Sequence, residues 1–193
     1  MNMGSGPIVV VSGLPRSGTS MLMQALSAGG MAVLTDHQRV ADEDNPRGYL
    51  ELELAKQIQQ DTSWLAQAQG RAVKLVSSLL RHLPREYRYK IIFMQRDMAE
   101  VLASQHEMLR RRGANAGGND ASLARAFERH LTAVAAWIAT QAHMDVVYVN
   151  YRDVLSDPVT QFTRIRTFLR RDLALDAMVS VVDQRLHRQR SGR

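Results

Sequence analysis

The chain contains no cysteine among its 193 residues, which excludes disulfide bonds, thiolate metal sites and a cysteine nucleophile. It also lacks a run of about 20 apolar residues long enough to cross a bilayer. Its first residues lack the basic start and the cleavage site of a signal peptide. Its six histidines, at positions 37, 82, 106, 130, 143 and 187, show no compact ligand spacing. We therefore expect a cytoplasmic protein with no metal site and no membrane insertion.

Composition and charge further narrow the class of protein and the kind of ligand. With 45% hydrophobic and 23% charged residues, the sequence suits one water-soluble domain spanning residues 1–193. The net charge of +6 is rich in arginine, including residues 110–112 and several between 185 and 193, and it favours an anionic ligand. No helix-turn-helix, zinc finger or aromatic-plus-basic motif is present, so we expect no nucleic-acid partner. A polyphosphorylated nucleotide explains the positive charge of the chain as well as a nucleic acid would.

Hydrophobic periodicity predicts strands that alternate with helices. Short buried strands are predicted at residues 8–11, 72–76, 90–94 and 146–149. Amphipathic helices are predicted at residues 19–29, 49–69, 98–112, 123–138, 158–169 and 176–186. Polar stretches at 33–48 and 113–120 are interpreted as a functional loop and a surface loop. The order indicates an α/β, three-layer P-loop fold with a mostly parallel central sheet flanked by helices.

Two local signals within this pattern concern the site. In open α/β sheets, ligands bind beyond the carboxyl ends of the strands, so we expect the chemistry to follow Val11, Val76, Met94 and Val149. The helix that follows the third strand has Asp97 at its N-cap and Glu100 three residues later, which is capping-box spacing.

A glycine-rich loop follows the first strand and opens the first helix. It reads Gly13-Leu14-Pro15-Arg16-Ser17-Gly18-Thr19-Ser20. Glycines let backbone N–H groups approach an anion, and the helix N-terminus adds partial positive charge. The alternative is a solely structural turn, although such a turn has no need of arginine, serine and threonine together. The loop lacks the Walker lysine, since Thr19 stands in its place and the cation is Arg16.

The stretch from Pro15 to Ser20 resembles the 5′-phosphosulfate loop of the sulfotransferases that use 3′-phosphoadenosine 5′-phosphosulfate (PAPS). That resemblance implies PAPS as sulfuryl donor, adenosine 3′,5′-bisphosphate (PAP) as product, and donor binding by Pro15, Arg16, Ser17, Gly18, Thr19 and Ser20. Arg96, with Ser104 eight residues later, resembles the family's element for the donor's 3′-phosphate. Nearly two helical turns, roughly 10 Å, let both side chains converge on one phosphate. Alternatively, Arg96 pairs with a neighbouring acid and Ser104 is only a small helix residue.

Other segments extend the resemblance over most of the chain. Residues 42–51 are similar to a segment of bacterial sulfotransferase-like proteins, and residues 151–154 resemble the family's Tyr-Glu-Asp-Leu. The resemblance implies that Tyr151 lies near the adenosine, although Arg152 replaces the usual acid. The basic tail from Arg185 to Arg190 either adds a 3′-phosphate contact or is a solvated chain end.

Three residues are candidates for catalysis. Arg16 is the expected electrophilic residue. Many family members have a base in Lys-[Ser/Thr]-His, but residues 74–76 here read Lys-Leu-Val, so the histidine is absent. The resemblance places the segment of Glu51 at the acceptor mouth and makes Glu51 the expected base, with Glu53, Asp44 and His37 as alternatives. Lys74 either contacts the transferring sulfuryl group or simply ends a buried strand.

The sequence therefore predicts transfer of a sulfuryl group from PAPS to a hydroxyl or amine of a small-molecule or peptide acceptor. Two alternatives remain open. One is a non-catalytic module that binds PAP or PAPS, and the other is a P-loop small-molecule kinase in which Arg16 replaces the Walker lysine. Nothing in the sequence names the acceptor or the oligomeric state.

Overall fold

A computed structural model describes residues 6–36, 38, 48–111, 113 and 120–182. Its strands are β1 (Ile8–Gly13), β2 (Ala72–Lys74), β3 (Tyr89–Gln95) and β4 (Met144–Asn150). Its helices are α1 (Thr19–Ala28), α2 (Glu53–Lys56), α3 (Leu65–Ala68), the 3₁₀ helix η1 (Ser77–His82), α4 (Met98–Arg111), α5 (Asp120–Ala139), α6 (Tyr151–Ser156), α7 (Pro158–Leu169) and α8 (Leu175–Ser180).

The four described strands form one sheet in the order β2-β1-β3-β4, and every neighbouring pair is parallel. In its register Val10 of β1 lies between Val73 of β2 and Ile91 of β3. All six residues of β1 are buried, as expected for a central strand covered on both faces. The predicted α/β class with a parallel central sheet is confirmed.

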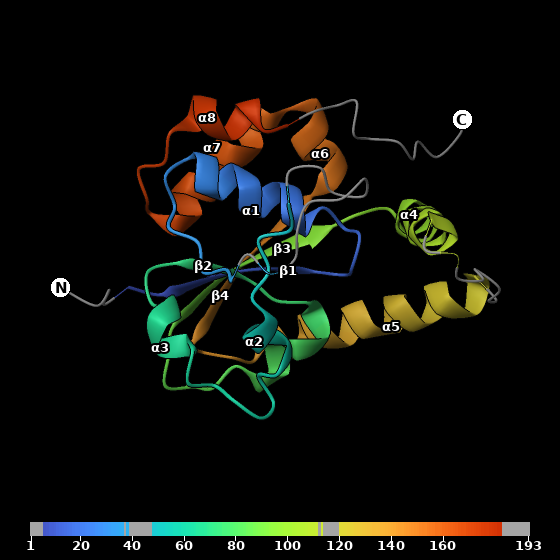
Figure 1. Cartoon of the computed structure of the whole chain (residues 1–193), viewed down its shortest axis with the longest axis horizontal. Helices are drawn as coiled ribbons and strands as arrows, with labels where there is room; N and C mark the ends of the chain where they lie inside the picture. Colours follow the sequence, from blue (N-terminus) through green and yellow to red (C-terminus); the bar gives the residue numbers. More distant parts are fainter. Residues whose placement is uncertain (1–5, 37, 39–47, 112, 114–119, 183–193) are drawn as a thin grey trace.

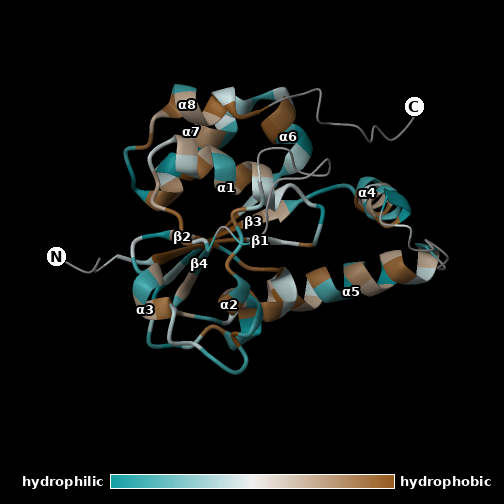
Figure 2. Cartoon of the chain, viewed as in Figure 1, coloured by the Kyte–Doolittle hydropathy of each residue, from teal (hydrophilic) through white to brown (hydrophobic). Residues whose placement is uncertain are grey.

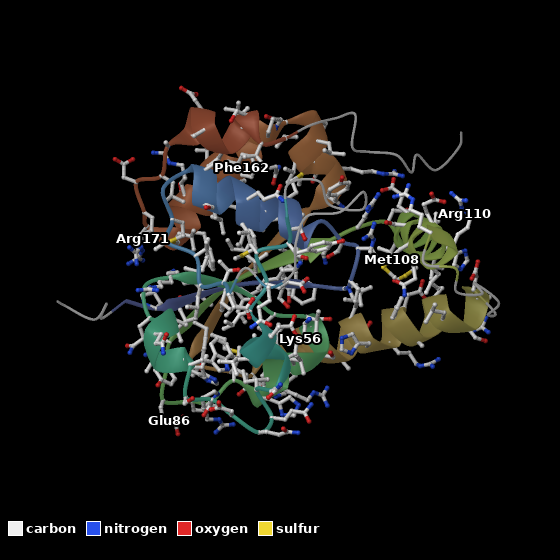
Figure 3. The ribbon with its side chains drawn as sticks, in the orientation of Figure 1. Lys56, Glu86, Met108, Arg110, Phe162 and Arg171 are labelled. Carbon is white, nitrogen blue, oxygen red and sulfur yellow. The ribbon has the colours of Figure 1, made fainter. Side chains whose placement is uncertain are left out.

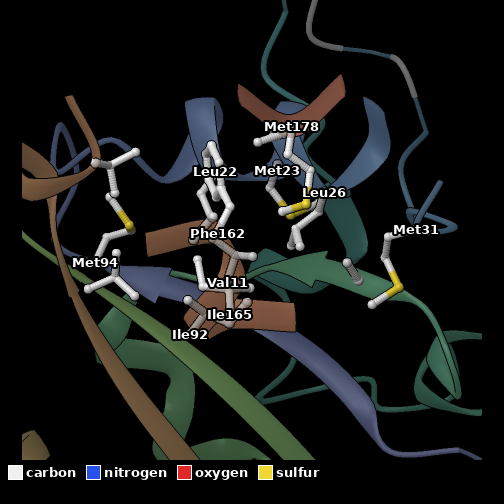
Figure 4. Packing of buried hydrophobic residues seen from close by; sticks show 14 of the residues in the cluster. Val11, Leu22, Met23, Leu26, Met31, Ile92, Met94, Phe162, Ile165 and Met178 are labelled. Carbon is white, nitrogen blue, oxygen red and sulfur yellow. The ribbon is translucent and has the colours of Figure 1, made fainter. Parts of the chain in front are cut away.

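Helices cover both faces of the sheet (Figure 1). Val9 and Val11 of β1 pack in the cluster with α1, α6, α7 and α8, whereas Ile8 and Val10 pack on the opposite face, which α2, α3, η1 and α5 cover. This alternation follows from the two-residue period of a strand. Figure 4 shows the first cluster, where Leu22, Phe162 and Met178 meet above β1 and β3. In Figure 2 the strands are mainly brown and the exposed helix surfaces carry teal residues.

The single helix predicted for residues 49–69 is wrong. Leu50 has a left-handed backbone (φ 48°) and Leu52 is extended, so regular helix is confined to the short α2 and α3. The segment nevertheless buries Leu52, Ile58 and Trp64 in the cluster below the sheet. Its leucine spacing imitates a helix, but covering the sheet requires an irregular path, and this tertiary burial outweighs helix propensity.

Some predicted segments lie partly outside the described residues. These include most of the loops at 33–48 and 113–120, the end of the helix predicted at 176–186, and the basic tail. The described part of that last helix, α8, ends at Ser180. None of the described helices combines the length and apolar composition that a membrane crossing requires.

Candidate active site

The candidate residues gather at the carboxyl edge of the sheet. Lys74 ends β2, Arg96 follows β3 directly, and Tyr151 follows β4. Because all described strands are parallel, these positions share one edge with the loop after β1. The expectation that the chemistry follows the strand ends agrees with this placement.

We call the glycine-rich loop from Gly13 to Ser20 the phosphate loop, and its backbone requires both of its glycines. Gly13 has a φ of +151°, and a Cβ there would lie 2.6 Å from Ser17 Oγ. Gly18 has a φ of +101°, and a Cβ there would lie 2.5 Å from the Tyr151 ring. Arg16 also has a left-handed backbone (φ 70°), which is costly for a residue with a side chain. Such strain at a loop arginine is typical of a residue held for binding or catalysis.

The loop leads directly into the N-terminus of α1. Ser17 Oγ donates to the carbonyl of Leu14 at 2.7 Å, which closes the turn. Among the described residues, no side chain caps α1 at Gly18. The first N–H groups of a helix have no partner within the helix, so they are suited to bind a phosphate. The loop, with Pro15 exposed and Thr19 buried at the helix start, therefore fits an anionic group.

Arg16 connects the loop to α4. Its Nε donates to Ser104 Oγ at 2.9 Å, and its carbonyl accepts a hydrogen bond from Arg96 Nη1 at 3.0 Å. Arg96 and Ser104 were expected to converge on one phosphate, and in the structure they meet through Arg16. The three residues thus form one continuous polar cluster between the loop and the start of α4.

Arg96 is also held by an acid and by an aromatic ring. Its Nε donates to Glu100 Oε2 at 3.0 Å, so the pairing with a neighbouring acid that the sequence left open is present. The guanidinium lies 4.4 Å from the centroid of the Tyr151 ring. Arg152, which stands where the family pattern has an acid, binds the other oxygen of Glu100 at 2.8 Å. We call Arg16, Arg96, Glu100, Ser104, Tyr151 and Arg152 the arginine cluster.

Tyr151 supports both parts of this cluster. It is buried, and its ring fills the space next to Gly18 on one side and Arg96 on the other. Burial raises the pKa of its phenol, and the charge of Arg96 partly opposes that rise. The phenol is therefore neutral at physiological pH. In this position Tyr151 fixes the loop relative to Arg96.

A second group of side chains joins the loop to β2. Lys74 Nζ donates to Ser20 Oγ at 2.9 Å and to Glu51 Oε1 at 2.9 Å. The Lys74 and Glu51 side chains are 10% and 14% exposed, so the pair is largely shielded from water. Lys56 adds a longer contact to Glu51 Oε2, at 3.5 Å. We call Lys74 and Glu51 the lysine–glutamate pair.

Backbone contacts hold Glu51 in place although it lies in no helix or strand. Thr35 Oγ1 donates to the Glu51 carbonyl at 2.8 Å, and the N–H of Glu53 donates to Asp36 Oδ2 at 2.6 Å. Burial alone would raise the pKa of Asp36, but the backbone N–H groups of Glu53 and Gln38 bring it below its usual value. Asp36 is therefore a charged anchor for the segment that carries Glu51.

The remaining candidate bases differ in position. The Glu53 side chain is 40% exposed and pairs with Lys56 at 2.5 Å. Asp44 and His37 lie outside the described residues, as does the tail with Arg185 to Arg190. Of the candidate bases that the structure describes, Glu51 is the one joined to Lys74 and, through it, to the phosphate loop.

Sequence reasoning missed the role of one residue. Glu100 was interpreted as part of a helix cap, and its backbone N–H does donate to Asp97 Oδ1 at 3.2 Å. Its carboxylate, 1% exposed, binds Arg96 and Arg152. The spacing of four residues between Arg96 and Glu100 was the available signal, since it brings two side chains together on a helix start.

Several solved structures resemble this chain. A sulfotransferase domain from a Synechococcus PCC 7002 olefin synthase shares 18% identity and a TM-score of 0.55, over 97% of this chain and 81% of that one. A Mycobacterium tuberculosis sulfotransferase shares 17% identity and a TM-score of 0.55, over 95% and 72%. A mouse sulfotransferase complexed with PAP shares 15% identity and a TM-score of 0.53, over 92% and 62%. At these identities the likeness concerns the fold.

No curated protein matches the chain by sequence. The sulfotransferase domain family, however, matches residues 7–189, which include the phosphate loop, the arginine cluster and the lysine–glutamate pair. Since this match covers nearly the whole chain, the protein belongs to the sulfotransferase domain family.

Proposed function

We propose that this sulfotransferase domain moves a sulfuryl group from PAPS to a hydroxyl or amine of an acceptor. Family membership supports the class of reaction. The observation that carries the donor assignment is the double contact of Arg16, which joins the phosphate loop to Ser104 and to Arg96. PAPS carries two anionic groups on its ribose, the 5′-phosphosulfate and the 3′-phosphate, so it matches a cationic site that is divided between a loop and a helix start. Two of the similar structures, a mouse sulfotransferase and a retinol dehydratase, contain PAP.

In this proposal each half of the site binds one of the two anionic groups of the donor. The residues from Pro15 to Ser20, with the N-terminus of α1, bind the 5′-phosphosulfate through backbone N–H groups and hydroxyls. Arg96 and Ser104 bind the 3′-phosphate. Tyr151 holds the two halves at a fixed separation because it lies next to both Gly18 and Arg96.

Arg16 and the lysine–glutamate pair then supply the groups that transfer requires. PAPS provides the sulfuryl group, whose bond to the 5′-phosphate breaks as its bond to the acceptor oxygen forms, so that PAP leaves. Arg16 and Lys74 stabilise the negative charge that develops on the departing phosphate and on the sulfuryl oxygens. Glu51, a carboxylate beside two lysines, accepts the proton of the acceptor hydroxyl.

The test combines donor binding with a search for the acceptor. The purified chain is titrated with PAP without metal, and separately with ATP and magnesium. It is then incubated with sulfate-labelled PAPS and fractionated cell extract. We expect tight metal-independent PAP binding and the transfer of label to a small molecule or peptide.

Matched outcomes separate the alternatives. Label transfer that disappears in the Glu51→Gln variant but persists in Glu53→Gln supports the proposal. Tight PAP binding with no labelled product in any fraction contradicts it in favour of the non-catalytic module. Magnesium-dependent ATP binding without PAP binding contradicts it in favour of the kinase.

A further inference from the structure

Glu100 is a buried carboxylate between two guanidinium groups that come from distant parts of the chain. It lies in the first turn of α4 and is 1% exposed. Its Oε2 accepts from Arg96 Nε at 3.0 Å, and its Oε1 accepts from Arg152 Nε at 2.8 Å. Arg96 is 8% exposed, whereas Arg152 is 48% exposed. Glu100 therefore has a shielded partner on the donor side and a half-exposed partner on the outer side.

A carboxylate at this depth requires partners for both oxygens. Removing one partner of a buried ion pair leaves an uncompensated charge, which is strongly unfavourable. Without Arg152, Oε1 would lose a hydrogen bond, and we expect Glu100 to compete more strongly for the N–H groups of Arg96. Arg152 donates to Oε1, the outer oxygen of Glu100. Arg96 therefore needs to donate to Glu100 only through its Nε.

This arrangement fixes the orientation of Arg96. Its Nε binds Glu100, its Nη1 binds the Arg16 carbonyl, and one face lies against the Tyr151 ring. Three contacts from three different elements define the plane and the direction of the guanidinium. A planar group held in this way offers its remaining N–H groups in one geometry, which is the condition for selective phosphate binding.

We propose that Glu100, compensated on its outer side by Arg152, is a positioning residue that holds Arg96 in the orientation that binds the 3′-phosphate of the donor. The proposal rests on the proposed function, because it takes Arg96 as the 3′-phosphate ligand. It adds Glu100 and Arg152 to the donor site. Both residues act through Arg96 and do not contact the donor themselves.

The test compares two nucleotides that differ only at the 3′-position. Calorimetry gives the dissociation constants of PAP and of adenosine 5′-monophosphate for the whole chain. The constant for the monophosphate divided by the constant for PAP measures the contribution of the 3′-phosphate. In Glu100→Gln we expect this ratio to fall about tenfold, by analogy with the lower end of the loss that follows removal of the outer partner of a metal ligand. Affinity for the monophosphate should stay within about twofold. A merely structural role would weaken both nucleotides together.

The same helix offers a matched control. Glu107 also lies between two arginines, Arg110 and Arg111, and the hydrogen bond from Arg110 holds the pKa of Glu107 at about 2. It follows Glu100 by two turns, about 10 Å along α4. Glu107→Gln removes an equivalent charge from the helix and should leave the nucleotide ratio unchanged. An unchanged ratio in Glu100→Gln would overturn the proposal.

A second variant tests the contact between Glu100 and Arg152 if Glu100→Gln does not fold. Arg152→Gln changes a half-exposed side chain and leaves Glu100 to compete for Arg96. We expect the ratio to fall about threefold and to stay reduced in about 0.5 M salt, which screens exposed charges. A ratio that recovers fully in salt would overturn the proposal. If the wild-type chain itself binds both nucleotides equally, the 3′-phosphate role of Arg96 in the proposed function is wrong.

Discussion

The arginine cluster and the lysine–glutamate pair lie at the same edge of the sheet, but they are held in different ways. Glu100 and Tyr151 of the arginine cluster are buried side chains at helix starts, and they bind Arg96 from two sides. Glu51 lies in an irregular segment that hydrogen bonds from Thr35 and to Asp36 fasten in place. Figure 3 shows Lys56, beside this segment, well apart from Arg110 on α4.

The difference in support suggests that the two regions have different roles. Groups that bind a constant ligand gain from rigid support, because preorganisation lowers the entropy cost of binding. The group proposed to meet the acceptor, Glu51, lies on a segment that is fastened mainly through its backbone. The arginine cluster should therefore govern donor affinity, whereas the lysine–glutamate pair should govern transfer with little effect on PAP binding.

Glu51→Gln should produce the largest change and separate the two regions most clearly. Loss of a general base typically lowers turnover by two to four orders of magnitude, so label transfer from PAPS should fall about 10³-fold. PAP affinity measured by calorimetry should change by about twofold at most. Glu53→Gln is the control, since Glu53 is an exposed neighbour on the same segment. Equal losses in both variants would remove Glu51 from the mechanism.

Arg16→Ala should affect both donor binding and transfer, because Arg16 belongs to the arginine cluster and also to the phosphate loop, which Ser20 joins to Lys74. Losing one preorganised contact costs about 3 to 4 kcal/mol in the transition state, which corresponds to two to three orders of magnitude in turnover. The rate of label transfer under donor saturation measures this effect. Arg110→Ala, an exposed arginine on α4, should transfer label normally. A smaller loss in Arg16→Ala with intact donor binding would contradict the electrophilic role.

Gly18→Ala tests whether Tyr151 supports the loop. The new Cβ would lie 2.5 Å from the Tyr151 ring at a φ of +101°, so we expect the free energy of unfolding to fall by about 1 to 3 kcal/mol and PAP binding to weaken. Gly30→Ala has a similar φ of +94° but nothing within 4 Å of the added Cβ. Urea denaturation of both variants separates backbone strain from the ring contact. Equal destabilisation would show that Tyr151 simply moves aside.

Asp36→Asn should have the smallest effect and should act on the lysine–glutamate pair alone. Loss of the charged acceptor for the Glu53 N–H should lower the free energy of unfolding by about 1 to 2 kcal/mol and slow transfer several-fold. Asp61→Asn, which removes the charge from a similar acceptor of the Ser63 N–H, should keep its transfer rate. Donor affinity should be unchanged in both variants.

The contribution of Asp36 should also depend on pH. The pKa of Asp36 in the folded chain is below its ordinary value of 3.8, so the ionised form favours folding. Its stabilisation is complete above pH 3.8 and is lost as the pH falls through the lower folded value. The stability difference between wild type and Asp36→Asn should therefore vanish in strong acid. A difference that persists there would indicate that its charge is not what anchors the segment.

Some of this structure follows from local patterns alone. Ile8 to Val11 form an uninterrupted β-branched run, and such a run fits a strand that is buried on both faces. The glycines at 13 and 18 and the arginine at 16 indicated a phosphate loop because their spacing matches a strand–turn–helix start. The predicted helix at 49–69 was wrong because its leucines do not share one buried face. Leu54 is exposed, Leu50 packs against the cluster with α1, and Leu65 lies in the cluster on the opposite face of the sheet.

The sequence by itself determined the α/β order, the phosphate loop and the resemblance of Arg96 and Ser104 to a donor site, since each depends on residues within about ten positions of one another. Only the tertiary structure decided that Arg16 lies between Arg96 and Ser104, that Glu100 binds Arg152 rather than serving only as a cap, and that Glu51 meets Lys74. These contacts join residues 23 to 88 positions apart. No local periodicity encodes such pairings, because they arise only when the parallel sheet brings its strand ends to one edge.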